Sequence, residues 1–113
     1  MSTIRSMVLV SSDPYSINQG ATYVYQRLQE EIKKFGLSDE VSVLRMVSDI
    51  GRHNITPSVI IYPESVIYGP ILPENVPYLV EEHLFNGRIA TQLLAPMREL
   101  SGHISWLSAR KGT

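Results

Sequence analysis

The chain has 113 residues, of which 43% are hydrophobic, so it forms a single domain with a modest core. Ten Lys and Arg balance eleven Asp and Glu, which excludes a global field directed at nucleic acid or an anionic membrane. The sequence contains no cysteine, which excludes disulfides, thiol redox chemistry and thiolate metal sites.

The charge is unevenly distributed along the chain. Residues 88–113 carry a formal charge of +3, whereas the first 87 residues carry −4. No apolar run approaches the roughly 20 residues of a membrane helix, and the N-terminus lacks a signal-peptide pattern. We therefore expect a cytoplasmic protein with no membrane insertion and no nucleic-acid partner.

Residues 7–36 contain the first clear structural signal. Residues 7–10 are continuously apolar, as in a strand buried on both faces. A polar loop, residues 11–20, follows. From Ala21 the apolar residues recur at helical spacing up to Phe35. Gly36 is placed to end this helix in the left-handed conformation.

The second half of the chain predicts more strands and a second helix. Residues 41–46 indicate a strand with one face less buried, and a polar loop extends to Pro57. Residues 58–62 and 66–69 flank a short turn, which favours an antiparallel hairpin. Asn75 is expected to cap a helix in which Pro77 fits only the first turn, and Gly87 follows its end.

The order of elements is β-α-β-β-β-α, which predicts an α/β fold of thioredoxin-like arrangement: a mixed sheet covered by two helices. Residues 1–87 form this domain. Residues 88–113 follow no single period and form a C-terminal extension. Trp106, Arg110 and Lys111 make the extension a candidate docking segment. Packing of the extension on its own domain is the alternative.

Several short motifs have familiar spacing. They are Gly20-Ala21 at the helix start, Tyr62-Pro63-Glu64 at the turn, Tyr68-Gly69, Pro73-Glu74-Asn75-Val76-Pro77, and Val80-Glu81-Glu82-His83-Leu84. In these motifs the chain resembles the thioredoxin-like [2Fe-2S] ferredoxins, which are related to the small cluster-binding subunit of NADH:quinone oxidoreductases. The resemblance covers roughly residues 7 to 90.

The resemblance implies four cluster-ligand positions, in a Cys-x4-Cys and a Cys-x3-Cys pattern. This chain keeps both spacings but has Ser11, Ser16, Asp49 and His53 at those positions. Because [2Fe-2S] clusters favour thiolate ligands, we expect a degenerate, vacant site and no cofactor. The alternative is a [2Fe-2S] cluster held by these four residues. Tyr15 and Ile17 are candidates to cover the vacated space.

Other chemistry has weaker support. Asp49 and His53 lack an obvious third ligand, so no metal site is expected. The chain has no Gly-x-Ser-x-Gly motif and no oxyanion-hole motif, so we expect no catalytic residues and no enzyme activity.

We therefore expect a non-catalytic, ferredoxin-derived subunit or accessory protein of a larger redox or electron-transfer complex, with a structural or partner-binding role. The alternative is a [2Fe-2S] electron-transfer protein with non-cysteine ligands. The expected partners are protein subunits of a redox complex. Exposed strand edges also make a homodimer an expectation.

Overall fold

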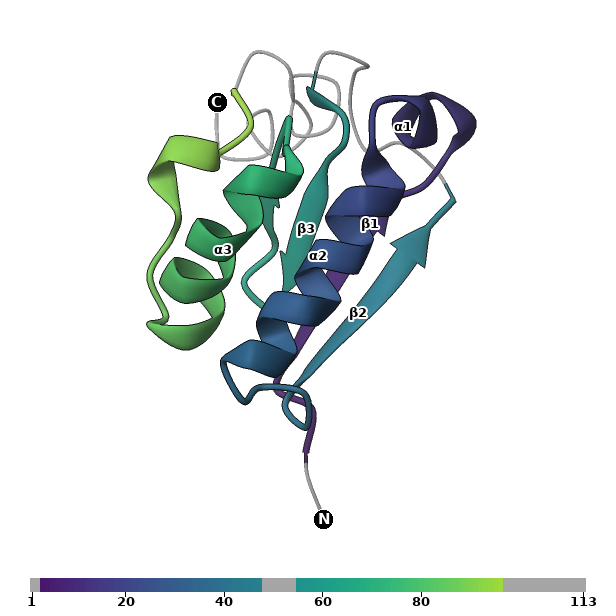
Figure 1. The fold of residues 1–113 in the computed structure, drawn as a ribbon. Helices are drawn as coiled ribbons and strands as arrows, with labels where there is room; N and C mark the ends of the chain where they lie inside the picture. Colours follow the sequence, from purple (N-terminus) through teal and green to yellow (C-terminus); the bar gives the residue numbers. More distant parts are fainter. Residues whose placement is uncertain (1–2, 48–54, 97–113) are drawn as a thin grey trace.

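A computed structural model describes residues 3–47 and 55–96 (Figure 1). The elements in chain order are β1 (Ser6–Ser11), α1 (Pro14–Asn18), α2 (Ala21–Lys34), β2 (Val41–Met46), β3 (Val59–Tyr62), β4 (Val66–Tyr68), η2 (Pro73–Asn75), α3 (Val76–Leu79), η3 (Val80–Phe85) and η4 (Thr91–Leu93). The predicted order of strands and main helices is confirmed. The one-turn helix α1 lies in the segment that was predicted to be a loop.

The four strands form one mixed sheet in the order β2-β1-β3-β4. Strands β1 and β2 are parallel, with Ser6 opposite Val41 and Ser11 opposite Met46. Strand β3 is antiparallel to both β1 and β4. The predicted hairpin and the parallel pairing of the first two strands are therefore confirmed.

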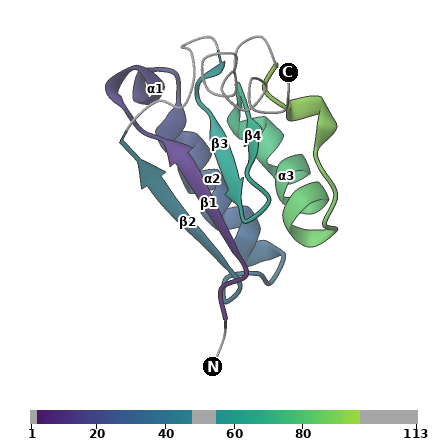
Figure 2. The same cartoon turned by 180° about the vertical axis from the view of Figure 1, so that it is seen from behind.

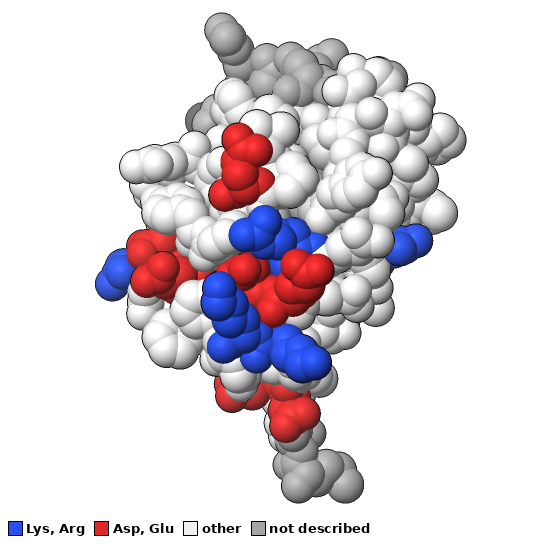
Figure 3. Space-filling view, in the orientation of Figure 1, with Lys and Arg blue, Asp and Glu red and all other residues white. Residues whose placement is uncertain are grey.

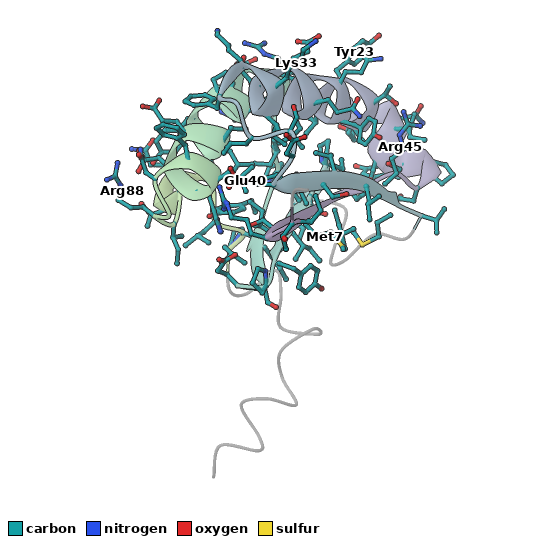
Figure 4. The ribbon with its side chains drawn as sticks, turned by 90° about the horizontal axis from the view of Figure 1, so that it is seen from below. Met7, Tyr23, Lys33, Glu40, Arg45 and Arg88 are labelled. Carbon is teal, nitrogen blue, oxygen red and sulfur yellow. The ribbon has the colours of Figure 1, made fainter. Side chains whose placement is uncertain are left out.

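Helices α2 and α3 cover the same face of the sheet, and the strands lie in front when the molecule is seen from behind (Figures 1 and 2). Val8 and Val10 are fully buried under the helices, whereas Met7 is 39% exposed. Figure 4 shows Met7 pointing away from the helical layer. The prediction that this strand is buried on both faces is therefore wrong, because both helices pack on one side.

Helix α2 is amphipathic, as its spacing predicts. The residues that it buries against the sheet and α3 are Ala21, Val24, Leu28 and Ile32. Gly36 has φ 72° and its N–H donates to the carbonyl of Lys33 at 3.0 Å, so the helix ends where it was predicted to end.

The second helical region is less regular than predicted. A 3-10 turn (η2) leads into α3, which continues as the π-helix η3. Asn75 occupies the N-cap position of α3, as predicted, but its side chain makes no capping hydrogen bond to α3. Its Oδ1 instead accepts a hydrogen bond from the N–H of Leu72 at 2.8 Å and closes the preceding turn. Pro77 lies in the first turn of α3, as expected. The π-helix places His83 and Leu84 on the buried side.

Residues 88–96 run beside β4. The N–H of Ala95 donates to the carbonyl of Ile67 at 3.1 Å, and Ala90 is fully buried. These residues belong to the predicted C-terminal extension. The rest of that extension, which includes Trp106, Arg110 and Lys111, lies outside the described residues.

Charged side chains are interleaved on the helical face of the molecule (Figure 3). Arg27 pairs with Glu31 at 3.4 Å, and Arg88 pairs with Glu82 at 3.0 Å. The helical face therefore carries no large patch of one sign. Within residues 3–47 and 55–96, no helix is long and apolar enough to span a bilayer.

Candidate functional site

The two predicted ligand positions in the described chain lie close together at one end of the sheet. Ser11 is the last residue of β1, and Ser16 belongs to α1, which follows directly. Asp13 caps this helix and Pro14 occupies its first turn, a common arrangement at a helix start. Both serine side chains are completely buried.

Thr56 connects the two serines. Its hydroxyl lies 3.3 Å from Ser11 Oγ and also forms a hydrogen bond with Ser16 Oγ. Thr56 itself is only 5% exposed. Two loops that are 40 residues apart in sequence are thus joined through three hydroxyl groups.

The direction of these hydrogen bonds can be assigned from their two ends. At one end, the N–H of Ser58 donates to Ser11 Oγ at 2.9 Å. At the other, the hydroxyl of Ser16 donates to Asp13 Oδ1 at 2.5 Å. Each hydroxyl has one hydrogen to donate. Ser11 therefore donates to Thr56, and Thr56 donates to Ser16. We call this set, Ser11, Thr56, Ser16 and Asp13, the hydroxyl relay.

Asp13 is the acceptor at the end of the hydroxyl relay. Burial raises the pKa of its carboxyl, but hydrogen bonds from the hydroxyl and N–H of Ser16 outweigh this effect, so the pKa lies below its ordinary value of 3.8. A carboxylate stabilised in this way keeps the Ser16 hydroxyl in the role of donor. The relay is therefore polarised toward Asp13.

Beyond Ser11 the backbone is closely packed. The Oγ of Ser58 is buried and has no hydrogen-bond partner among the residues that the structure describes. Directly after strand β4, a Cβ placed on Gly69 would lie 2.2 Å from the carbonyl oxygen of Ile55 and 3.4 Å from the Cα of Ser58. Gly69 therefore permits a close approach that no side chain would allow.

The other predicted site residues are distributed differently. Asp49 and His53 lie outside the described residues. Tyr15 and Ile17 were candidates to cover the site, but they are 38% and 48% exposed. The side chain that lies between the two serines is that of Thr56. In the described chain, no group of three or more His, Asp or Glu side chains is arranged to hold a metal ion.

Sequence reasoning missed Asp13 and Thr56. A signal for Asp13 was present, because an Asp followed by Pro, with Ser three residues after the Asp, is a typical helix N-cap pattern. Thr56 had no such signal, since its contact with Ser16 depends on how two distant loops meet.

A second buried network lies between β4 and η3. The N–H of Ala90 donates to the hydroxyl oxygen of Tyr68 at 3.0 Å, and this hydroxyl lies 2.6 Å from His83 Nδ1. His83 Nε2 lies 3.3 Å from Glu64 Oε1. A hydrogen bond from the backbone N–H of Glu64 and the nearby His83 hold the pKa of the Glu64 carboxyl below its ordinary value of 4.5. His83 is thus buried and hydrogen-bonded at both ring nitrogens.

This architecture defines a thioredoxin-like protein. The wild-type thioredoxin-like [2Fe-2S] ferredoxin from Aquifex aeolicus, known from a crystal structure, superposes with a TM-score of 0.74 at 24% identity, over 82% of this chain and 98% of that one. A Cys-to-Ser variant of the same ferredoxin superposes with a TM-score of 0.73 at 26% identity, over 80% of this chain and 98% of that one. The predicted fold class is confirmed.

Sequence similarity identifies the family. The 2Fe-2S ferredoxin of Clostridium pasteurianum is 30% identical over 82 residues, which span 70% of this chain and 76% of that protein. The 2Fe-2S ferredoxin of Aquifex aeolicus is 29% identical over 76 residues, 67% of this chain and 68% of that protein. The chain belongs to the thioredoxin-like [2Fe-2S] ferredoxin family. No family model matches it.

These relatives correct one prediction. We expected no cofactor, but both relatives are 2Fe-2S ferredoxins, so the family implies a [2Fe-2S] cluster. The donor atoms at the described ligand positions do not match a thiolate-bound cluster. Ser11 and Ser16 are buried hydroxyls whose hydrogens are donated to Thr56 and Asp13, and the sequence contains no cysteine.

Proposed function

We propose that this ferredoxin-family chain is a non-catalytic subunit or accessory protein of a larger electron-transfer complex and acts by binding protein partners. The observation that carries this proposal is the hydroxyl relay. Two positions that hold cluster ligands in the family pattern are hydrogen-bonded within the protein itself. Ser11 and Ser16 therefore contribute to the fold, and the family scaffold remains available for docking.

The C-terminal extension, residues 88–113, is the proposed docking segment. Its net charge of +3 contrasts with the −4 of the first 87 residues. Trp106, Arg110 and Lys111 combine one large aromatic ring with two cations, and such residues are enriched where proteins bind one another. We propose that these three residues contact an acidic, partly apolar surface on a redox subunit.

The experiment compares three tagged proteins expressed in the native host: the full chain, a chain that ends at Pro96, and a Trp106→Ala/Arg110→Ala/Lys111→Ala variant. We expect the full chain to co-purify subunits of an electron-transfer complex and both altered proteins to lose them. A Lys33→Ala/Lys34→Ala variant is the control, because it removes two cations from the exposed side of α2. Equal recovery of the same subunits with all four proteins would contradict docking through this segment.

The second candidate function is electron transfer through a [2Fe-2S] cluster with non-cysteine ligands, and the cofactor named for both relatives favours it. The candidate ligands are Ser11, Ser16, Asp49 and His53. For this function the two serines would have to release their hydrogen bonds to Thr56 and Asp13. Absorption bands in the visible range, with matching iron and sulfide, would identify this function.

A further inference from the structure

A hollow lies between the helices on the helical face of the molecule. It has a volume of about 400 Å³ and is lined by Glu31, Lys34 and Phe35 from the C-terminal end of α2, and by Pro77 and Glu81 from α3 and η3. Residues three or four apart on a helix share one side of it, so each helix contributes one wall. A hollow of this volume is in the range of small-molecule sites in proteins.

Glu31 is the buried charge of this hollow. It is only 6% exposed and belongs to the buried stripe of α2, whose other members are all apolar. Within residues 3–47 and 55–96, its carboxylate has one hydrogen-bond partner, Arg27, whose Nε lies 3.4 Å from Oε2. Because a carboxylate has two oxygens that each accept hydrogen bonds, Glu31 Oε1 remains available to a ligand.

The stability of the fold does not account for this carboxylate. Removing a charge from water is costly unless the charge is well paired. Glu31 lies in the last turn of α2, where the helix dipole disfavours a negative charge. In its pair with Arg27 the basic residue comes first, which is the weaker order for two residues four apart on a helix. Glu31 therefore gives the hollow a negative potential that a bound cation would neutralise.

The lining favours an organic cation over a metal ion. Ca²⁺ and Mg²⁺ take about six or more oxygen ligands. In the described chain, no group of three or more His, Asp or Glu side chains is arranged to hold a metal ion, and only Glu31 and Glu81 bring carboxylates to this hollow. Phe35 and Pro77 add apolar surface, and the Phe35 ring packs against that of Phe85 with 5.1 Å between their centres. An aromatic wall attracts both an ammonium group and an apolar body.

We propose that this hollow binds a small primary amine with an apolar body. The ammonium group donates to Glu31 Oε1, and Glu81 on the opposite wall adds a second negative charge. The apolar body contacts Phe35 and Pro77. Lys34 also lines the hollow and repels a second positive charge, so the site disfavours polyamines.

The amine site is separate from the surfaces described above. It lies at the end of α2 opposite to α1 and the hydroxyl relay (Figure 1), where acidic and basic side chains meet on the helical face (Figure 3). The inference goes beyond the proposed partner docking and does not rest on it, because its ligand is a small molecule and none of its residues belongs to the C-terminal extension.

The test is the binding of phenethylamine to the full chain, followed in two-dimensional NMR spectra of the backbone amides. We expect saturable shifts that are largest at residues 31–35 and 77–81. Phenethyl alcohol and phenylpropanoate carry the same aromatic body with a neutral and a negative end. The amine should bind at least about tenfold more tightly than the alcohol, and the anion should not bind.

Glu31→Gln keeps the size of the side chain and removes its charge. We expect the affinity for phenethylamine to fall about tenfold, whereas the urea midpoint of unfolding should not fall, because the charge is poorly compensated in the fold. Glu30→Gln is the matched control, since it removes the same charge from the adjacent, exposed position, which does not line the hollow. Its affinity for the amine should equal that of the wild type.

Glu81→Gln provides a second variant at an exposed position, where the change does not endanger folding. It removes the second carboxylate of the hollow, and we expect the affinity for phenethylamine to fall about threefold. This variant tests the site even where Glu31→Gln does not fold.

Four results would overturn the inference. The first is the absence of saturable shifts at these residues with millimolar phenethylamine. The second is equal affinity for the amine and the alcohol, since charge would then play no part. The third is unchanged affinity in both Glu31→Gln and Glu81→Gln. The fourth is tighter binding of acetyl-lysine amide than of phenethylamine, which would assign the hollow to a lysine side chain of a partner protein.

Discussion

The hydroxyl of Tyr68 donates to Nδ1 of His83 across the gap between strand β4 and helix η3, with the two atoms 2.6 Å apart. The Glu64 carboxylate near Nε2 can only accept a hydrogen bond, so Nε2 carries the hydrogen of the neutral ring and Nδ1 accepts from Tyr68, whose oxygen accepts the N–H of Ala90. His83 Nδ1 is therefore an acceptor, and its Nε2–H faces Glu64. The sequence suggests only a packing role for Tyr68, but its hydroxyl is hydrogen-bonded to the buried ring of His83 and matches one tautomer of that ring.

Removing this hydroxyl should destabilise the fold. Tyr68→Phe leaves the Ala90 N–H and His83 Nδ1 without a partner, and we expect a loss of about 1–3 kcal/mol in the free energy of unfolding. Tyr25→Phe is the matched control, because its hydroxyl makes a long, exposed contact of 3.4 Å with Gln29. Urea denaturation followed by circular dichroism measures both. Equal stability of the two variants would contradict the role of the network.

Thr56 should be essential to the hydroxyl relay. Thr56→Val keeps the shape of the side chain but removes the group that accepts from Ser11 and donates to Ser16. We expect it to lose about 1–3 kcal/mol, and Thr56→Ser to recover most of that loss. Thr91→Val, at an exposed position, should be close to neutral. If Val and Ser at position 56 gave the same stability, the relay would contribute nothing.

The hydroxyl relay also predicts a pH dependence. The pKa of Asp13 is lower in the folded chain than its ordinary value of 3.8. Its contribution to stability is therefore fully present above the unfolded pKa and is lost as the pH falls through the folded pKa. The urea midpoint of unfolding is measured from about pH 6 downward. Below about pH 4, where an Asp carboxyl begins to take up protons, the midpoint should fall more steeply for the wild type than for Asp13→Asn. Parallel curves would contradict this prediction.

Local patterns identified most of the fold but not the partners of the buried polar groups. Helical spacing located α2, and Gly36 and Pro77 marked a helix end and a helix start. The π-helical form of η3 was not predicted, because its hydrogen-bonding pattern has no distinctive residue spacing. The exposure of Met7 was also missed. A run of apolar residues does not show whether helices cover one face of the sheet or both faces.

The candidate site shows the same limit. The spacing singled out Ser11 and Ser16 as a pair, and both side chains are buried, one at the end of β1 and the other within α1. The hydrogen bonds of the two serines involve Thr56 and the backbone N–H of Ser58. These two residues are distant in sequence and lie beside the serines only because β3 pairs with β1. The family resemblance identified the positions of the two serines, but it did not predict which groups donate and accept the hydrogen bonds between them.

Gly69 should tolerate no side chain. A Cβ at this position would meet the carbonyl oxygen of Ile55 at 2.2 Å, and a backbone atom cannot move aside as a flexible side chain can. We expect Gly69→Ala to cost about 3 kcal/mol or more, or to prevent folding. Gly36→Ala has nothing within 4 Å and should cost only about 1–2 kcal/mol, for its left-handed conformation. Similar thermal midpoints for the two variants would show that the loop at Ile55 can move.

The most direct test is to measure iron and acid-labile sulfide per chain in the wild type and in Ser16→Ala, both purified without oxygen. The Ser16 hydroxyl is donated to Asp13 and accepts from Thr56, so its removal should lower stability and leave the iron and sulfide content equal in the two proteins. Near-stoichiometric iron and sulfide in the wild type that disappear in Ser16→Ala would contradict the account and make Ser16 a cluster ligand.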